Sequence, residues 1–130
     1  MNFEHFALNV PNPIEQAKWY EKYCGMKIIK SLNQYPFTHF LSDELGTIVM
    51  EIYSNRLVSV PNYNNMNPLQ FHFAFAVENI IETKEQLVNA GALLLEEITL
   101  EDGSQVVMLK DPFGLSFQLC KRAINFFDKL

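Results

Sequence analysis

Four polar residues occupy matched positions in this sequence. The interval from His5 to Glu51 equals the interval from His72 to Gln118. Two imidazoles, a carboxylate and an amide oxygen form a ligand set that suits a divalent transition metal such as Zn, Ni, Co, Fe or Mn. Such an ion polarises a substrate oxygen or acidifies a bound water when part of its coordination sphere stays open. We therefore predict that these four residues are metal ligands and that Glu51 is also catalytic, as the carboxylate that can transfer a proton.

The matched spacing reflects an internal repeat. Residues His5–Glu15 and His72–Glu82 align without gaps, and seven of the eleven positions are identical. Roughly one identity would be expected by chance from ordinary residue frequencies. Such self-similarity indicates two copies of one structural unit. Residues that are equivalent in the two copies are therefore expected to occupy equivalent places in the fold.

Each copy shows the signals of one helix and four strands. Apolar residues alternate with polar or small ones over residues 3–10 and 71–77, which is typical of a strand. Asn12 and Asn79 then provide helix N-caps, and the helices are expected to run to about residues 24 and 90, each followed by a glycine. The remaining strands are predicted over residues 26–32, 36–41, 47–53, 93–100, 105–110 and 115–120.

These elements predict an α+β fold of two paired βαβββ modules, whose curved mixed sheets form a cleft. The whole chain, residues 1–130, is expected to be a single domain. Module one covers about residues 1–55, and module two covers about residues 70–122. Residues 56–69 are rich in Asn and are interpreted as a linker, with a lid over a pocket as the alternative. Residues 123–130 have apolar side chains at helical spacing and are predicted to form a C-terminal helix.

One face of each sheet should be covered by its helix, and the other should face the cleft. Phe6 and Phe73 belong to the apolar faces, so the histidine that precedes each of them points to an open face. The last strand of each module places Glu51 and Gln118 on these open faces in the same way. His39 has no counterpart in the second copy, and we interpret it as a structural residue. The other residues expected to line the substrate pocket are Asn9, Thr47, Val49, Tyr53, Ala74, Ala76, Met108 and Ser116.

The composition argues against several classes of partner. The chain has 10 Lys and Arg against 15 Asp and Glu, which gives a net charge of −5. Proteins that bind nucleic acids or anionic membranes by charge carry the opposite balance. We see neither an apolar run long enough to span a bilayer nor the pattern of a secretory signal at the N-terminus. Cys24 and Cys120 lie within apolar patterns and are expected to be reduced thiols, as in a cytoplasmic protein.

Over residues 1 to about 122 the sequence resembles the vicinal oxygen chelate superfamily, which comprises glyoxalases, bleomycin resistance proteins and extradiol dioxygenases. The stretches that carry the resemblance are HFALNV at 5–10, KWYEKYCGMK at 18–27, EIYSN at 51–55, HFAFAV at 72–77 and DPFGLSFQ at 111–118. The resemblance implies the glyoxalase-like fold and a metal held by the end strands through His5, Glu51, His72 and Gln118. It also implies chemistry on a small molecule that chelates the metal through neighbouring oxygens.

Two positions depart from the family pattern. Most catalytic members have glutamate where this chain has Gln118, and an amide cannot act as a base, which leaves Glu51 for that role. Members that use glutathione commonly have arginine where this chain has Asn9, so glutathione is not the expected substrate.

The leading hypothesis is therefore a divalent-metal-dependent lyase or isomerase of the glyoxalase type that acts on a small oxygenated molecule. Two alternatives stay open. One is a metal-free protein of the bleomycin-resistance type that binds a small molecule such as an antibiotic. The other is an Fe(II)-dependent dioxygenase with two histidines and one carboxylate as ligands. A homodimer is expected from the way modules of the superfamily pair and from the apolar tail. Neither nucleic acid nor membrane is expected as a partner.

Overall fold

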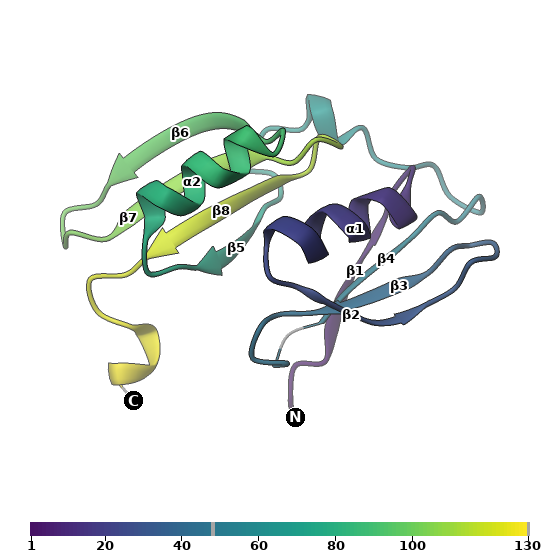
Figure 1. Cartoon of the computed structure of the whole chain (residues 1–130), viewed down its shortest axis with the longest axis horizontal. Coiled ribbons are helices and arrows are strands. Elements are labelled where there is room, and N and C mark those ends of the chain that lie inside the picture. Colours follow the sequence, from purple (N-terminus) through teal and green to yellow (C-terminus); the bar gives the residue numbers. More distant parts are fainter. Residues whose placement is uncertain (48, 130) are drawn as a thin grey trace. The chain divides into compact units, whose positions relative to one another are not determined.

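A computed structural model describes residues 1–47 and 49–129 of the chain, which divides into two compact units, Met1–Pro61 and Asn62–Leu130. In unit 1, β1 (His5–Asn9) is followed by α1 (Pro13–Tyr23), β2 (Lys27–Ser31), β3 (His39–Ser42) and β4 (Val49–Tyr53) (Figure 1). The strand order in the sheet is β1-β4-β3-β2. β1 runs parallel to β4, and the other neighbours are antiparallel, so the sheet is mixed.

Unit 2 repeats this arrangement. A single 3-10 turn at Tyr63–Asn65 precedes β5 (Phe73–Ala76), α2 (Ile80–Asn89), β6 (Leu93–Thr99), β7 (Gln105–Lys110) and β8 (Ser116–Lys121). The strand order is β5-β8-β7-β6, with β5 parallel to β8 and the other pairs antiparallel. The predicted α+β fold of two βαβββ modules with mixed four-stranded sheets is therefore confirmed.

Both helices begin with an asparagine cap, as predicted. The side chain of Asn12 accepts a hydrogen bond from the Glu15 backbone N–H at 3.4 Å, and Pro13 occupies the first turn. Asn79 accepts one from the Glu82 N–H at 3.2 Å, and its side-chain nitrogen donates to the Glu82 carboxylate at 2.9 Å. These bonds satisfy backbone donors that a helix leaves unpaired. The caps therefore start the two helices at equivalent points of the repeat.

Each helix packs on one face of its own sheet. In unit 1 the fully buried side chains include Ala17 and Tyr20 of α1 and, on the sheet, Leu41, Met50 and Ile52. In unit 2 they include Leu87 of α2 with Leu109, Phe117 and Leu119 of β7 and β8. Burial of each large side chain contributes about 1.5–3 kcal/mol. The faces turned away from the helices are the open faces named below.

One of the two edge strands of each sheet, β2 in unit 1 and β6 in unit 2, contains a register shift. It falls between Ile28 and Lys30 in β2 and between Leu94 and Glu96 in β6, which are equivalent places in the two units. An extra residue of this kind, a β-bulge, changes which face the following side chains occupy. The two edge strands therefore present their side chains in the same unusual order.

Several predicted elements are shorter in the structure, and two differ most in extent. The strand expected over residues 36–41 begins only at His39, because Phe37 has a left-handed backbone with φ of 59° and its N–H closes a turn on the Gln34 carbonyl at 2.7 Å. The tail forms a short 3-10 helix, Phe126–Lys129, in place of a helix over the whole of 123–130. Residue 48, in the strand predicted over 47–53, and residue 130, in the tail, lie outside the described residues.

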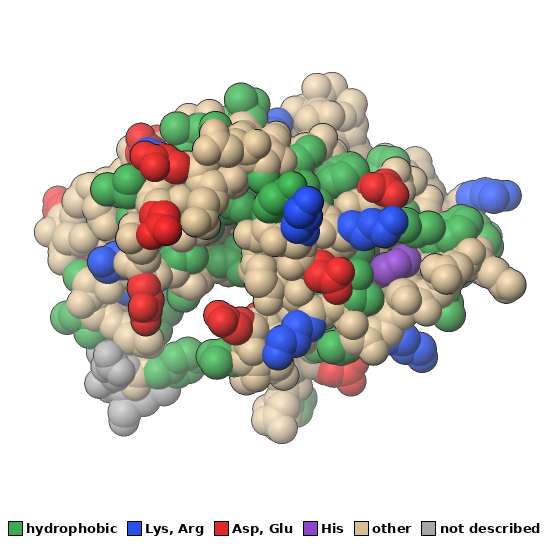
Figure 2. All heavy atoms as spheres, viewed as in Figure 1, with side chains coloured by type: hydrophobic (Ala, Val, Ile, Leu, Met, Phe, Trp, Pro, Cys, Tyr) green, Lys and Arg blue, Asp and Glu red, His purple; other side chains and the backbone are tan. Residues whose placement is uncertain are grey.

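The surface carries charges of both signs. On the face drawn in Figure 2, acidic and basic side chains are interspersed over both helices and the strands beside them. In the part of the chain that the structure describes, neither helix has the length and hydrophobicity that a membrane span requires.

Candidate functional site

His5 and Glu51 lie side by side on the open face of unit 1. β1 and β4 are parallel neighbours, and Ala7 is opposite Glu51 in their register. His5 is two residues from Ala7, so its side chain lies on the same face. The distance between His5 Nε2 and Glu51 Oε2 is 3.7 Å, which is longer than a hydrogen bond. Their side chains are 39% and 19% exposed, so both atoms belong to a partly open polar pair.

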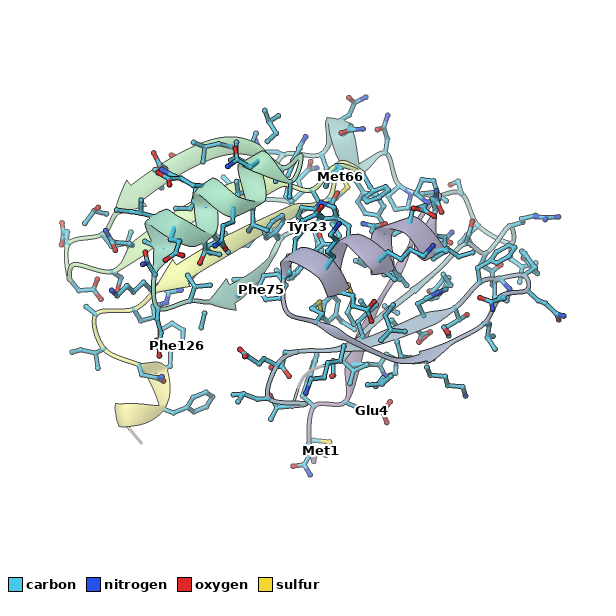
Figure 3. All side chains as sticks on the ribbon, viewed as in Figure 1. Met1, Glu4, Tyr23, Met66, Phe75 and Phe126 are labelled. Atoms are coloured by element: carbon cyan, nitrogen blue, oxygen red, sulfur yellow. The ribbon has the colours of Figure 1, made fainter. Side chains whose placement is uncertain are left out.

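The ring of His5 is oriented by its neighbour in the sequence. His5 Nδ1 lies 2.8 Å from Glu4 Oε1, and Glu4 stands at the start of β1 (Figure 3). An ionised carboxylate only accepts hydrogen bonds, so Nδ1 carries the proton that is donated. In the neutral ring, Nε2 then has a lone pair, and it is the nitrogen beside Glu51.

His72 and Gln118 occupy the repeat-equivalent positions in unit 2. Ala74 is opposite Gln118 in the parallel register of β5 and β8, as Ala7 is opposite Glu51 in unit 1. His72 precedes β5 by one residue. Its Nδ1 lies 2.7 Å from the backbone carbonyl of Pro68. A carbonyl also only accepts, so Nδ1 is again the donor and Nε2 has the lone pair.

As neutral rings the two histidines therefore have the same tautomer, although different groups select it. Metal-binding histidines are typically held in this way, with one ring nitrogen donating to a carboxylate or a carbonyl and the other available to the metal. Among the residues that the structure describes, no group of three His, Cys, Asp or Glu side chains is placed to hold a metal ion. Of the four predicted ligands, His5 and Glu51 lie 3.7 Å apart, and His72 and Gln118 hold the equivalent positions in the strands of unit 2 and just before them.

The thiol of Cys120 contacts the side chain of Gln118. Cys120 Sγ lies 3.5 Å from Gln118 Oε1 and 4.0 Å from an Arg122 guanidinium nitrogen. Burial raises the pKa of the Cys120 thiol, and the charge of Arg122 opposes that shift in part. A neutral thiol donates a weak hydrogen bond and is a poor nucleophile. We therefore assign Cys120 to the support of Gln118.

The predicted pocket residues fall into two groups. Most of them are on strands and share the open faces with the predicted metal ligands. Val49 and Tyr53 are in β4 beside Glu51, and Ala74 and Ala76 are exposed in β5. Met108 is directly opposite Gln118, and Ser116 is in β8 as well. Thr47 lies instead in the turn before β4, where its N–H and hydroxyl bind the Asp43 carboxylate at 2.8 and 3.0 Å. Its hydrogen bonds thus close a turn.

Asn9 is buried and anchors the loop that follows β4. Its side-chain nitrogen donates to the Asn55 carbonyl at 3.0 Å and to the Val58 carbonyl at 3.3 Å, and its oxygen accepts from the Asn55 N–H at 2.7 Å. The equivalent residue in unit 2 is Ala76, which makes no such anchor possible.

Replacement of Asn9 by alanine should lower the free energy of unfolding by about 2 kcal/mol, because three hydrogen bonds of the loop are lost at once. Urea denaturation would measure the change. Asn9→Asp keeps the acceptor for the Asn55 N–H but sets a carboxylate oxygen against the Asn55 and Val58 carbonyls, so at neutral pH it should lose at least as much stability as Asn9→Ala. A smaller loss in Asn9→Asp than in Asn9→Ala would contradict the role assigned to the anchor.

Sequence reasoning missed an aromatic side chain on the open face of unit 1. Phe40 is opposite Glu51 in the antiparallel register of β3 and β4, and its ring meets the His5 ring edge-on with centroids 6.4 Å apart. The next residue back, His39, is buried on the helix side and its Nδ1 bonds the Phe37 carbonyl at 2.7 Å. The structural interpretation of His39 is thereby supported. Because Phe40 is an apolar residue in a short strand, the sequence contains no signal that it belongs to the site.

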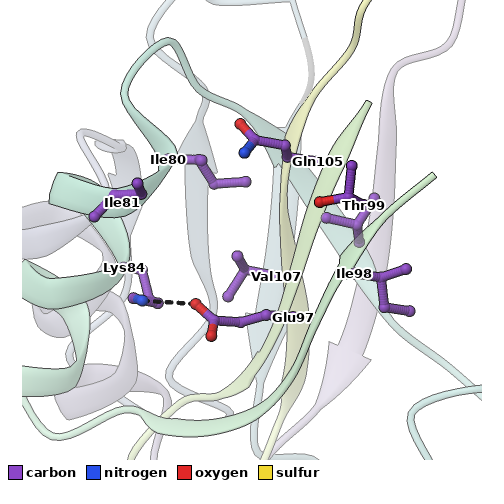
Figure 4. A pocket seen from close by; sticks show the side chains of 9 residues that line it. Ile80, Ile81, Lys84, Glu97, Ile98, Thr99, Gln105 and Val107 are labelled. Atoms are coloured by element: carbon purple, nitrogen blue, oxygen red, sulfur yellow. Dashed lines mark hydrogen bonds and ion pairs between the residues drawn. The ribbon is translucent and has the colours of Figure 1, made fainter. Parts of the chain in front are cut away.

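A hollow of about 280 Å³ lies on the other side of the second sheet. It is lined by α2, β6 and β7, including Ile80, Ile98 and Val107 (Figure 4). An ion pair between Lys84 Nζ and Glu97 Oε1, 2.6 Å long, crosses it. Val107 is opposite Leu119, so this hollow lies on the helix side of the sheet and away from Gln118. It therefore forms no part of the candidate site.

Comparison with known proteins agrees with the fold of two βαβββ modules described above. The family profile described as Glyoxalase/Bleomycin resistance protein/Dioxygenase superfamily matches residues 2–119. A search of curated proteins gave no match. Among solved structures, a glyoxalase family protein from Enterococcus faecalis is 25% identical with a TM-score of 0.65, over 90% of this chain and 94% of that one.

Two further structures have different printed descriptions. An antibiotic binding protein from Streptomyces sp. CB03234 is 10% identical with a TM-score of 0.75, over 95% of this chain and 97% of that one. A glyoxalase I mutant from Zea mays is 22% identical with a TM-score of 0.74, over 95% of this chain but only 46% of that one. At these identities the likeness shows the shared fold alone.

Proposed function

Because the chain belongs to the Glyoxalase/Bleomycin resistance protein/Dioxygenase superfamily, we propose that it is a divalent-metal-dependent lyase or isomerase acting on a small oxygenated molecule. His5 and Glu51 from one unit and His72 and Gln118 from the other would be the metal ligands. Two imidazole nitrogens, a carboxylate and an amide oxygen suit Zn, Ni, Co, Fe or Mn.

One observation carries this proposal. Both repeat-related histidines donate from Nδ1, to Glu4 and to Pro68, and so have Nε2 as the available nitrogen. A histidine that serves only as a surface polar group has no need of a fixed tautomer. The same donor arrangement at two repeat-equivalent positions, one of them 3.7 Å from the Glu51 carboxylate, is the arrangement expected of ligands.

Glu51 is the residue that we expect to transfer the proton. It is the one carboxylate of the four ligands, it is 19% exposed, and it lies on the face that is not covered by α1. A proton on a carbon next to an oxygenated carbon of the substrate could be moved by this carboxylate. A bound divalent cation would supply electrostatic stabilisation of the oxygen that becomes negative. Val49, Tyr53 and Phe40 would shape the surface on which the substrate lies.

The competing function is metal-free binding of a small molecule. The amide of Gln118 favours it, because a neutral residue replaces a carboxylate that would bind a cation more strongly. In that case the polar residues of the open faces would hydrogen-bond a ligand directly. For either function we propose a homodimer, with the exposed Ile124 and Phe126 in the subunit contact.

Metal analysis separates the two functions. Protein purified without chelators should contain about one divalent ion per chain, and addition of Ni, Co, Zn or Mn to stripped protein should raise its melting temperature. The carbon-bound hydrogens of dihydroxyacetone should exchange with deuterium from solvent in the loaded protein, and Glu51→Gln should abolish this exchange. Absence of any bound ion, together with no stabilisation by these metals, would contradict the proposal.

A further inference from the structure

The open face of unit 1 presents one continuous row of side chains across its four strands. Ala7 is opposite Glu51, Glu51 is opposite Phe40, and Phe40 is opposite Lys30. Directly paired residues in neighbouring strands point to the same face of the sheet. The row therefore runs from a carboxylate, over an aromatic ring, to an ammonium group on the edge strand β2.

The bulge in β2 adds a second ammonium group to the same face. Lys27 pairs with Ser42, and Lys30 pairs with Phe40, with the register shift between them. Residues three apart on a regular strand point to opposite faces, so without the extra residue one of these lysines would be on the helix side. The bulge thus gathers Lys27 and Lys30 at the edge of the open face, where both are exposed.

These two lysines have no acidic partner among the described residues. Lys18 pairs with Glu15 at 3.6 Å and Lys84 with Glu97 at 2.6 Å, whereas no carboxylate of the described chain lies within 4.0 Å of Lys27 or Lys30. In a chain with a net charge of −5, they form a local cationic site.

Protection of the sheet edge does not account for this pair. Lysines on edge strands do discourage unwanted strand pairing. The edge strand of unit 2 has the same bulge, however, and carries Leu93 and Glu96 at the equivalent positions. One charge, Glu96, therefore serves the edge of unit 2, so edge protection explains a single charge there but not the second lysine of unit 1 or the shared positive sign.

We propose that the open face of unit 1 binds an anionic substrate, namely a small conjugated or aromatic carboxylate. Its acid group would be held by Lys27 and Lys30, its planar body would lie on Phe40, and its second oxygenated group would point to His5 and Glu51. Glu51 and Lys30 are two strands apart, about 10 Å between backbones. Repulsion from Glu51 and attraction to the lysines both orient the acid group toward β2. This inference rests on the proposed function, because it assigns the substrate class of the same site.

Binding of trans-cinnamate to metal-free protein tests the inference. The full chain is kept in EDTA, and cinnamate is titrated while the ring protons of His5 are followed by NMR. Cinnamamide, which has the same shape and no charge, is the matched ligand. Removal of each lysine, as Lys27→Gln and Lys30→Gln, should weaken cinnamate binding about threefold, and the double variant about tenfold. Cinnamamide should bind the natural protein about as weakly as cinnamate binds the double variant.

Lys18→Gln serves as the control variant, because Lys18 is exposed on α1 and away from the open face. It should leave the affinity for cinnamate unchanged. Equal affinities for cinnamate and cinnamamide, or a double variant with undiminished affinity, would overturn the inference. Since the titration contains no metal, its result is separate from that of the metal analysis. A protein that binds cinnamate but no metal would contradict the proposed enzyme function and would still support the anion-binding site of Lys27 and Lys30.

Discussion

Replacement of His5 by alanine should lower the affinity for a divalent metal by at least about 100-fold. The variant loses one of four donors, and its neighbour Glu51 loses the imidazole that lies 3.7 Å away. His72→Ala should have an effect of similar size, because His72 is the repeat-related residue with the same donor arrangement. Competition with a chromophoric chelator, with Co²⁺ or Ni²⁺ as the metal, would measure both. Affinities that stay within a factor of three of the natural protein would remove both histidines from the ligand set.

The neighbour of His5 provides a finer test of the same site. Glu4→Gln keeps an oxygen that can accept from Nδ1 at 2.8 Å but removes its charge, so metal affinity should fall about tenfold. Glu15→Gln is the matched control, because Glu15 is also an exposed glutamate of unit 1 and lies at the start of α1. A general electrostatic effect would change both variants alike, whereas support of the His5 ring predicts a change in Glu4→Gln alone.

Gly114→Ala should destabilise unit 2 by about 2–5 kcal/mol. Gly114 has a φ of +93°, which costs an alanine about 1–2 kcal/mol. A Cβ at this position would also overlap the side chain of Asn64, and the resulting overpacking costs about 1–3 kcal/mol. The Asn64 backbone is held by Lys110 Nζ, which donates to its carbonyl at 2.6 Å, so relief of the overlap requires the Asn64 side chain to change its rotamer.

The repeat supplies the control for this prediction. Gly46 ends the equivalent turn of unit 1, its φ is +72°, and a Cβ there would meet nothing within 4 Å. Gly46→Ala should therefore cost only the backbone strain of about 1–2 kcal/mol. Urea denaturation of both variants gives the difference directly. Equal losses would show that the contact with Asn64 relaxes without cost.

The parts of the fold that depend on local rules could be predicted from the sequence. Alternation along a strand is fixed by the backbone, so the faces of Glu51 and Gln118 followed from their apolar neighbours, and the paired registers agree with them. The helix starts at Asn12 and Asn79 depend on a side chain that bonds the backbone N–H three residues later, so they could also be predicted from the sequence. The repeat then allowed one module to be checked against the other.

The parts that depend on contacts between distant segments could not be predicted. The Pro68 carbonyl reaches His72 only because of the path of residues 62–71, for which the sequence contains no periodic signal. Asn9 has the correct face for a pocket residue, yet its amide is drawn to Asn55 because buried polar groups need partners. The position of Lys30 beside Phe40 depends on a bulge, and nothing in the residue types marks where the extra residue falls.

The matching bulges in β2 and β6 bear on how the two modules of the chain arose. Both halves of the chain carry the additional residue at the same place, although Lys27 and Lys30 flank it in one half and Leu93 and Glu96 in the other. The simplest explanation is that the ancestral single module already had this insertion before it was duplicated and fused. Once both copies shared one gene, each could mutate alone. The lysine pair of β2 could then arise on one edge while the equivalent edge kept other residues.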